Sequence, residues 1–400
     1  MPIQWAHESC DLYDDPVSGA RIIQLTSAAA ISNNIYGEQP YCSADGKRII
    51  IARSQDFCFD EEGSLLVHEL DSLRITMAVR KARGVRGVFN NAWSGLLYYW
   101  TPDRKLVRLS LETLEQEEVY AEEDPAAPLA ASSVSPDQRY VLGMTTRLKG
   151  PGGPVFQIFH LDLVKKVRSV IFEHPEIANP HLQYNPIHGR QILVQNNRGW
   201  RLNEDGSINR SGGAAGTTLF VIDSDGGNMT PVPVGPPVTA TCTGHECFIA
   251  DTGKVFFSVG CDRPDSYRQK HDARYPRGNL FTARPGDEKP VCIEAPEHFC
   301  NHVSVSRCGR YFIADSHNGP GLFMNGHLQT PALIVGSLVS GKIRILVKET
   351  MAIGGGNQCT HTHPYLTTDN RYAIYNATPG NGPAQVFAAR LPPGFLESLG

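Results

Sequence analysis

The sequence predicts an all-β protein, a seven-bladed β-propeller with four-stranded antiparallel blades. A strand–turn–strand pattern recurs seven times, 42 to 64 residues apart, and we find no convincing long amphipathic helix. Four strands per unit at this period are typical of propeller blades, whereas a β-sandwich, the alternative, does not normally repeat seven times. The 38 glycines and 28 prolines also favour many turns. We expect one propeller domain over residues 1–400.

Each copy holds a polar or small residue, a short alternating stretch, a turn with Asp, Gly or Asn, and a β-rich run, which together predict a hairpin. The copies begin at Gln39, Asn90, Ser132, His181, His245, His302 and His363. A second strand pair follows most copies, for example "KLVRLSL" and "QIFHLDL". The N-terminal segment "GARIIQLT" is expected to join the C-terminal strands in one blade and so close the ring.

Composition narrows the class of protein. The net charge of −4 and pI near 6.4 argue against nucleic acid or an anionic membrane as a main partner. No run approaches the roughly 18 apolar residues of a membrane span, and "MPIQWAHESC" has no basic or apolar signal region. We therefore expect a cytoplasmic protein, a monomer or homodimer, whose ten cysteines are mostly reduced and buried.

The strongest signal is a histidine that opens each of four adjacent copies, seven or eight residues before its turn residue. These histidines are His181, His245, His302 and His363. The first strand of each propeller blade lines the central channel, so residues at equivalent positions converge on one mouth. A lone histidine here would be a packed core residue, but four in register indicate a functional cluster.

The stretch "GGGNQCTHTHPY" adds Gln358 and His361 just before His363. These polar residues either begin an ordinary strand or hold a metal. Histidines with one amide oxygen, and without thiolate or carboxylate, suit Mn²⁺, Fe²⁺ or Zn²⁺. On a regular strand, His361 and His363 point to the same side. By the same alternation Glu246 points away from the face of its neighbour His245.

Three cysteines stand two or three residues before histidines, namely Cys242, Cys300 and Cys359. They are possible extra thiolate ligands, but small cysteines that pack between blades are the favoured interpretation.

The motifs "QCTHTHPYLTTD", "CNHVSVSRCGRYFIAD", "CTGHECFIADTG" and "DPVSGARIIQLT…NNIYGEQPYCSADGKR" resemble those of the oligogalacturonate lyases. The resemblance covers most of the chain, more weakly in the middle blades. It implies a cytoplasmic seven-bladed propeller that cleaves small pectin fragments by metal-dependent β-elimination. It also makes Mn²⁺ the expected ion, with Fe²⁺ or Zn²⁺ as alternatives.

The resemblance assigns roles position by position. Gln358, His361 and His363 match the family's metal-binding element, and His302 matches the ligand from the preceding blade. His245 matches the histidine regarded as the general base. His181, which also matches a family histidine, is expected to orient substrate or donate a proton.

The chain departs from the family at two places. Thr217 or Thr218 stands where the family has an arginine for the uronate carboxylate, so Thr218 becomes a candidate substrate contact. Asn33 and Asn34 replace two N-terminal histidines. An inserted stretch, residues 261–278, could supply a cation from Arg263 or Arg268, although an exposed basic loop is the simpler interpretation.

These observations predict a lyase that acts on a small saccharide by β-elimination. A neutral 3-keto-sugar glycoside is the alternative substrate, because its ketone oxygen could bind a metal without an arginine. A non-catalytic propeller that binds a ligand or protein is the alternative of another class, since fold does not determine function.

Overall fold

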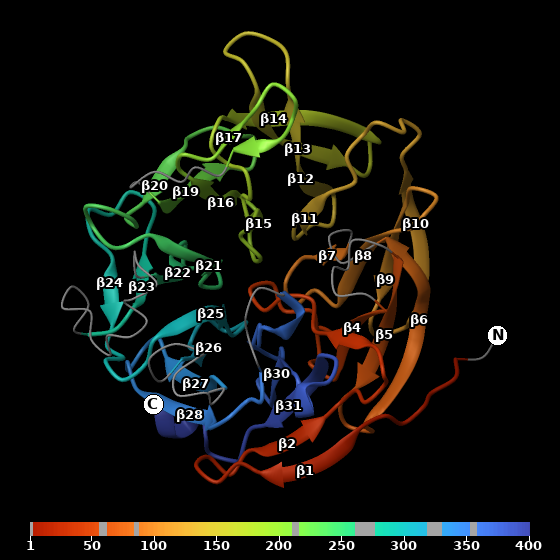
Figure 1. Cartoon of the computed structure of the whole chain (residues 1–400), viewed down its shortest axis with the longest axis vertical. Helices are drawn as coiled ribbons and strands as arrows, with labels where there is room; N and C mark the ends of the chain where they lie inside the picture. Colours follow the sequence, from red (N-terminus) through yellow and green to blue (C-terminus); the bar gives the residue numbers. More distant parts are fainter. Residues whose placement is uncertain are drawn as a thin grey trace.

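The blades form a ring around a central axis, with the first strand of each nearest the centre (Figure 1). The computed structural model describes residues 3–55, 62–83, 88–209, 216–260, 277–317, 330–352 and 358–400. Its seven antiparallel blades confirm the predicted propeller. Within the described residues, no helix is long and apolar enough to cross a membrane.

The first three blades are four-stranded meanders, in which consecutive strands pair. Blade 1 contains β3 (Ile31–Asn33), β4 (Arg48–Ser54), β5 (Glu62–Glu69) and β6 (Arg74–Arg83). Blade 2 contains β7 (Val88–Asn90), β8 (Leu96–Trp100), β9 (Lys105–Ser110) and β10 (Gln116–Ala121). Blade 3 contains β11 (Ala131–Val134), β12 (Tyr140–Arg147), β13 (Val155–Asp162) and β14 (Val167–His174).

The next three blades carry three of the four histidine-bearing copies. Blade 4 contains β15 (Gln183–Tyr184), β16 (Gln191–Asn197), β19 (Thr217–Asp223) and β20 (Thr230–Val232), with a side ribbon of β17 (Arg201–Leu202) and β18 (Ile208–Asn209). Blade 5 contains β21 (Cys242–Phe248), β22 (Val255–Val259), β23 (Leu280–Ala283) and β24 (Val291–Ile293). Blade 6 contains β25 (Cys300–Val305), β26 (Tyr311–Ser316), β27 (Ala332–Ser337) and β28 (Ile343–Val347).

The seventh blade joins the two ends of the chain, as the sequence predicted. It contains β29 (Tyr365–Leu366), β30 (Tyr372–Ala377), β31 (Gln385–Arg390), β2 (Arg21–Gln24) and β1 (Cys10–Asp14). Ile22 pairs with Ala389 and Ile23 with Ala388, and β1 adds a fifth strand that the prediction lacked. The described residues also include the short 3₁₀ helices η3 (Gln358–Thr360), η4 (Pro379–Asn381) and η5 (Glu397–Leu399).

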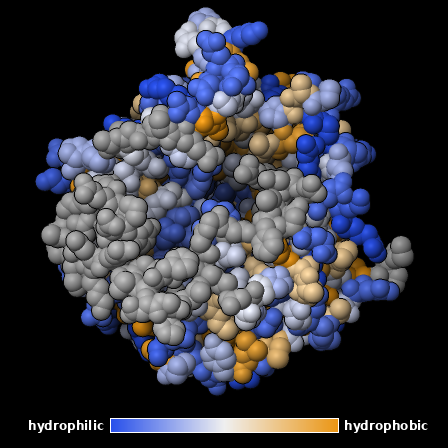
Figure 2. All heavy atoms as spheres, viewed as in Figure 1, coloured by the Kyte–Doolittle hydropathy of each residue, from blue (hydrophilic) through white to orange (hydrophobic). Residues whose placement is uncertain are grey.

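The core lies between the blades, because each sheet packs on its neighbours through both faces. Ile313 and Leu333 of blade 6 share a cluster with Tyr375 and Phe387 of blade 7, and all four are completely buried. The polar inner ends of the strands are left to the channel. Figure 2 shows a hollow near the centre of one face, where hydrophilic residues gather.

Candidate active site

The register predicted for the four histidines is the one observed. In each blade the turn is closed by a backbone hydrogen bond whose carbonyl acceptor lies four residues after the histidine. These bonds join Gly189 N to Asn185 O, Thr252 N to Ile249 O, Gly309 N to Ser306 O, and Asn370 N to Thr367 O. Equivalent backbone positions in adjacent blades therefore carry imidazoles, which converge near the axis of the ring.

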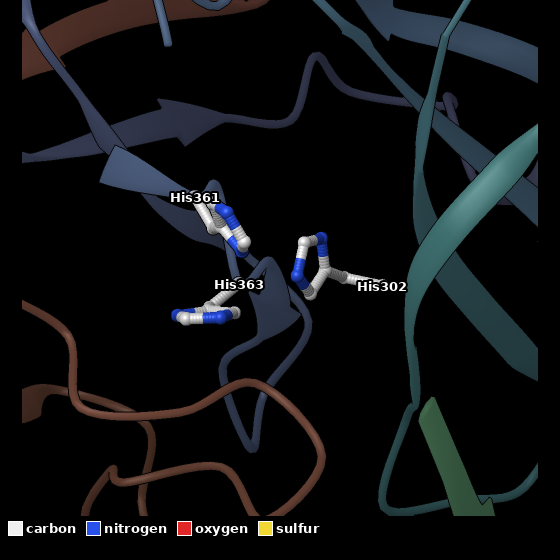
Figure 3. Close-up of side chains that lie close together, drawn as sticks. All are labelled: His302, His361 and His363. Carbon is white, nitrogen blue, oxygen red and sulfur yellow. The ribbon is translucent and has the colours of Figure 1, made fainter. Parts of the chain in front are cut away.

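Three imidazoles form one compact cluster (Figure 3), in which His302 from β25 faces His361 and His363. Each histidine offers one ring nitrogen, and these three nitrogens all lie within 4.8 Å of one another. The ring centroid of His302 lies 5.1 Å from that of His361 and 4.6 Å from that of His363. His361 and His363 stand between η3 and β29 rather than on a regular strand, so the predicted alternation is not what aligns them.

A carboxylate orients the first imidazole of the cluster. His302 Nδ1 lies 2.5 Å from Asp315 Oδ2, which also accepts the Thr362 hydroxyl at 2.7 Å. Burial raises the pKa of Asp315, but the neighbouring His302 and His317 lower that pKa well below its usual range. An ionised Asp315 accepts Nδ1–H and leaves Nε2 of His302 as the lone-pair nitrogen, as in the carboxylate–histidine pairs of metal sites.

Among the described residues, His302 Nε2 and His363 Nε2 are buried and lack a hydrogen-bond partner. Buried polar atoms are almost always paired, so these nitrogens require an explanation. A divalent ion that takes a lone pair from each nitrogen provides one. Burial, His302 and His361 hold the pKa of His363 well below its usual range, which favours the neutral ring that such an ion binds. The residues present thus fit the metal that the sequence predicted.

The backbone at His363 is held in an unusual conformation. Its φ is +40°, a left-handed value that few non-glycine residues adopt. Asn34 Nδ2 donates to the His363 carbonyl at 2.7 Å. Gly37 packs so closely here that a Cβ atom would lie 2.7 Å from Pro364 O. The segment that follows β3 in blade 1 therefore supports the loop that carries His363 and places Tyr36 and Glu38 beside it.

His245 adjoins the cluster through its ring, 4.2 Å between centroids from His302. Its Nδ1 lies 3.0 Å from Glu38 Oε1 and 3.2 Å from the Tyr36 hydroxyl. Burial lowers the pKa of His245 well below its usual range, and the neighbouring imidazoles of His302 and His181 lower that pKa further. With Nδ1–H donated to Glu38, Nε2 of the neutral ring is the atom that can accept a proton.

A second cluster contains Glu38, His181 and Glu246. His181 Nδ1 lies 3.6 Å from Glu246 Oε1 and 3.9 Å from Glu38 Oε2. The expectation that Glu246 points away was wrong. Strand β21 is irregular between Cys242 and Glu246, where Gly244 has φ +90°, so simple alternation does not hold there.

Within the described residues, neither cluster includes the remaining residues that the sequence predicted for the site. The side chain of Gln358, at the start of η3, is exposed, and Arg263 and Arg268 lie outside the described residues. Thr217, at the start of β19, donates its hydroxyl to Asn197 Oδ1 at 3.1 Å. Thr218 is half-buried, and its methyl carbon lies 2.6 Å from the place that a Cβ on Gly235 would take.

Sequence reasoning missed Tyr36, Glu38 and Asp315. The bond from Gly46 N to Ser43 O closes the turn of blade 1, so Gln39, four residues before Ser43, matches the register of the histidines. Extending the register to blade 1 would have pointed to Gln39 and so to the neighbouring residue, Glu38. Asp315 has no such signal, because its place opposite His302 depends on the pairing of β26 with β25.

Comparison with known proteins supports the resemblance, although no family model matches the chain. An oligogalacturonide lyase of Pectobacterium atrosepticum is 21% identical over 398 residues, covering 95% of each chain. An oligogalacturonate lyase of Dickeya dadantii is 22% identical over 405 residues, with the same coverage.

Solved structures share the fold. An oligogalacturonate lyase in complex with manganese superposes with a TM-score of 0.68 at 17% identity, covering 98% of this chain and 99% of that one. The oligogalacturonate lyase of Vibrio parahaemolyticus has a TM-score of 0.68 at 16% identity, covering 99% and 100%. The chain therefore resembles the oligogalacturonate lyases over nearly its whole length.

Proposed function

We propose that the protein is a metal-dependent carbohydrate lyase that cleaves a small oligosaccharide or glycoside by β-elimination. One observation carries the proposal: a buried three-imidazole cluster lies directly beside His245, whose Nδ1 is bound by Glu38. A ligand set and a neutral base are thus adjacent. The lyases that the chain resembles support the reaction class.

We assign His302, His361 and His363 as metal ligands, with Gln358 as a fourth. Although the Gln358 side chain is exposed, it stands three residues before His361 and belongs to the element that the resemblance identifies. The manganese complex of a similar fold supports Mn²⁺, with Fe²⁺ and Zn²⁺ as alternatives. Such an ion supplies Lewis acidity toward a carbonyl or carboxylate oxygen of the substrate.

β-Elimination removes a proton from a carbon next to a carbonyl group and expels an oxygen from the adjacent carbon. His245 Nε2 takes that proton, because Nδ1–H is donated to Glu38 and the ring is neutral. Glu38 then stabilises the imidazolium that forms. His181 orients the substrate or returns a proton to the leaving oxygen.

The substrate is either a uronate or a neutral 3-keto-sugar glycoside. The keto-sugar is supported by the uncharged residues at the start of β19, where Thr217 bonds to Asn197 at the place of the family's arginine. A bound metal would polarise a ketone oxygen without a cationic partner.

The test is metal analysis followed by an ultraviolet scan for unsaturated products, with uronate and keto-sugar saccharides in the presence and absence of Mn²⁺. We expect bound metal and metal-dependent absorbance with one substrate class. Protein that holds no metal and shows no metal-dependent turnover would instead be a non-catalytic binding propeller.

A further inference from the structure

We propose that Glu38, His181 and Glu246 form a second divalent-cation site, distinct from the three-imidazole cluster. Their ligand atoms lie within 4.8 Å of one another and come from blade 1, blade 4 and blade 5. His181 Nδ1 is 3.6 Å from Glu246 Oε1 and 3.9 Å from Glu38 Oε2. Two donors bound to one ion at about 2.1 Å lie roughly 3 to 4 Å apart, so these spacings suit a shared ion.

Among the residues described, two of the three ligand atoms have no donor, whereas the third, Glu38 Oε2, accepts a hydrogen bond from Gln183 Nε2 at 3.2 Å. Within the described part of the chain, Glu246 Oε1 and His181 Nδ1 have no hydrogen-bond partner, and Glu246 is completely buried. Glu38 is 5% exposed, and the ion pairs recorded for both glutamates are with histidines. Burying two neighbouring carboxylates is costly unless positive charge joins them, and a cation would satisfy both unpaired atoms at once.

Each ligand is held by another contact. Glu38 Oε1 binds His245 Nδ1, and Cys242 Sγ donates to Glu246 Oε2 at 3.4 Å. The Asn179 amide lies 3.0 Å from His181 Nε2. Because Asn179 is exposed, its amide can turn so that its oxygen accepts Nε2–H, which leaves the Nδ1 lone pair for the ion. Such outer contacts typically orient metal ligands.

The backbone also aims His181 into the site. Its φ is +43°, close to the +40° of His363, which stands at the same register position three blades later. Left-handed conformations at non-glycine residues cost free energy and persist where the surroundings require them. The same strained conformation thus presents one imidazole to each cluster.

Two carboxylates and one imidazole favour Mn²⁺, Fe²⁺ or Zn²⁺, whereas Mg²⁺ and Ca²⁺ prefer oxygen donors alone. A competing occupant is a proton shared by the glutamates. Burial raises the pKa of both carboxyls, and the charge of Glu246 raises the pKa of Glu38 further. Because cation binding must displace that proton, the two occupants exclude each other. In this assignment His181 is a ligand rather than a proton donor.

The experiment is Mn²⁺ titration of chelator-treated full-length protein, with bound metal measured by elemental analysis after gel filtration. We expect two ions per chain in the wild type and one in Glu246→Gln and in His181→Gln. The His363→Ala protein should also bind one ion per chain, at the second site. The control Glu8→Gln, which changes a carboxylate paired with Arg53, should keep two.

A wild type that saturates at one ion, or a Glu246→Gln protein that still binds two, would overturn the second site. Circular dichroism identifies a variant that fails to fold, and His181→Gln then decides in place of Glu246→Gln. The readout is independent of turnover. Two ions without lyase activity would refute only the proposed reaction, and one ion with activity would refute only the second site.

Discussion

Blades 4 to 7 and blades 1 and 3 share the strand–turn–strand plan but carry different residues at one register position. In the later blades this position holds an imidazole, as at His302 and His363. In blade 1 it holds Gln39 and in blade 3 Ala131, each four residues before the carbonyl that closes the turn. The equivalent of blade 2, position 87, lies outside the described residues.

The polar atoms at this position are used differently. Gln39 Nε2 donates to the carbonyl of Ser132 at 3.0 Å, so it ties blade 1 to blade 3. His302 Nε2 and His363 Nε2 are buried, and within the described residues they have no such bond. The repeat therefore supplies position, whereas unsatisfied atoms mark where a ligand belongs.

The largest effect is expected at His245, the imidazole that we assign as base. His245→Ala should lower kcat by roughly 10²–10⁴-fold, the range of general base catalysis, while metal content stays at the wild-type level. Turnover and elemental analysis on the same preparation check this. If the metal is lost as well, His245 is a ligand and our assignment fails.

Loss of a ligand should be the next largest effect. His363→Ala should lower the affinity of the three-imidazole cluster for metal. The decrease should exceed the roughly 10–100-fold that is typical when a residue behind a metal ligand is removed. Mn²⁺ titration measures the change. Gln39→Ala is the matched control at the same register position, and it should bind metal as the wild type does. Equal loss in both variants would mean that the register position matters only for folding.

A buried imidazole outside the channel sharpens the comparison. His160 is bonded to the Tyr184 hydroxyl at 2.7 Å, and burial lowers its pKa to about 4. As pH falls, this imidazole takes up its proton in the unfolded chain at a higher pH than in the folded protein. Its contribution to the free energy of unfolding is therefore complete above pH 6.5 and is lost as the pH drops toward 4. The lost free energy approaches about 3 kcal/mol. Urea unfolding of wild type and His160→Gln across this window should show a steeper pH slope for the wild type, and parallel curves would contradict the expectation.

The smallest effect is expected at the carboxylate behind the cluster. Asp315→Asn keeps the shape but removes the charge that orients His302, and it should lower metal affinity by roughly 10–100-fold. Metal titration gives the change, and the melting temperature controls for folding. Unchanged affinity would show that Asp315 serves the fold rather than the ion.

Much of the fold was predictable because its signals are local. Each hairpin carries its own alternation and turn residue, so seven copies and the closing segment at Ile22 were visible in the chain. The fifth strand, β1, was missed, since its exposed residues "CDLYD" carry no apolar alternation. The resemblance to oligogalacturonate lyases is confirmed, whereas the roles of individual residues stay predictions.

The sequence by itself determined the repeat and the register of the four histidines, because hairpin geometry depends on neighbouring residues. Only the tertiary structure decided which atoms face the channel. The bulge at Gly244 turned Glu246 toward His181, and close packing of Gly37 on Pro364 brought Glu38 to His245. The contact between Glu38 and His245 alone joins residues 207 positions apart, and no local pattern encodes such a distance.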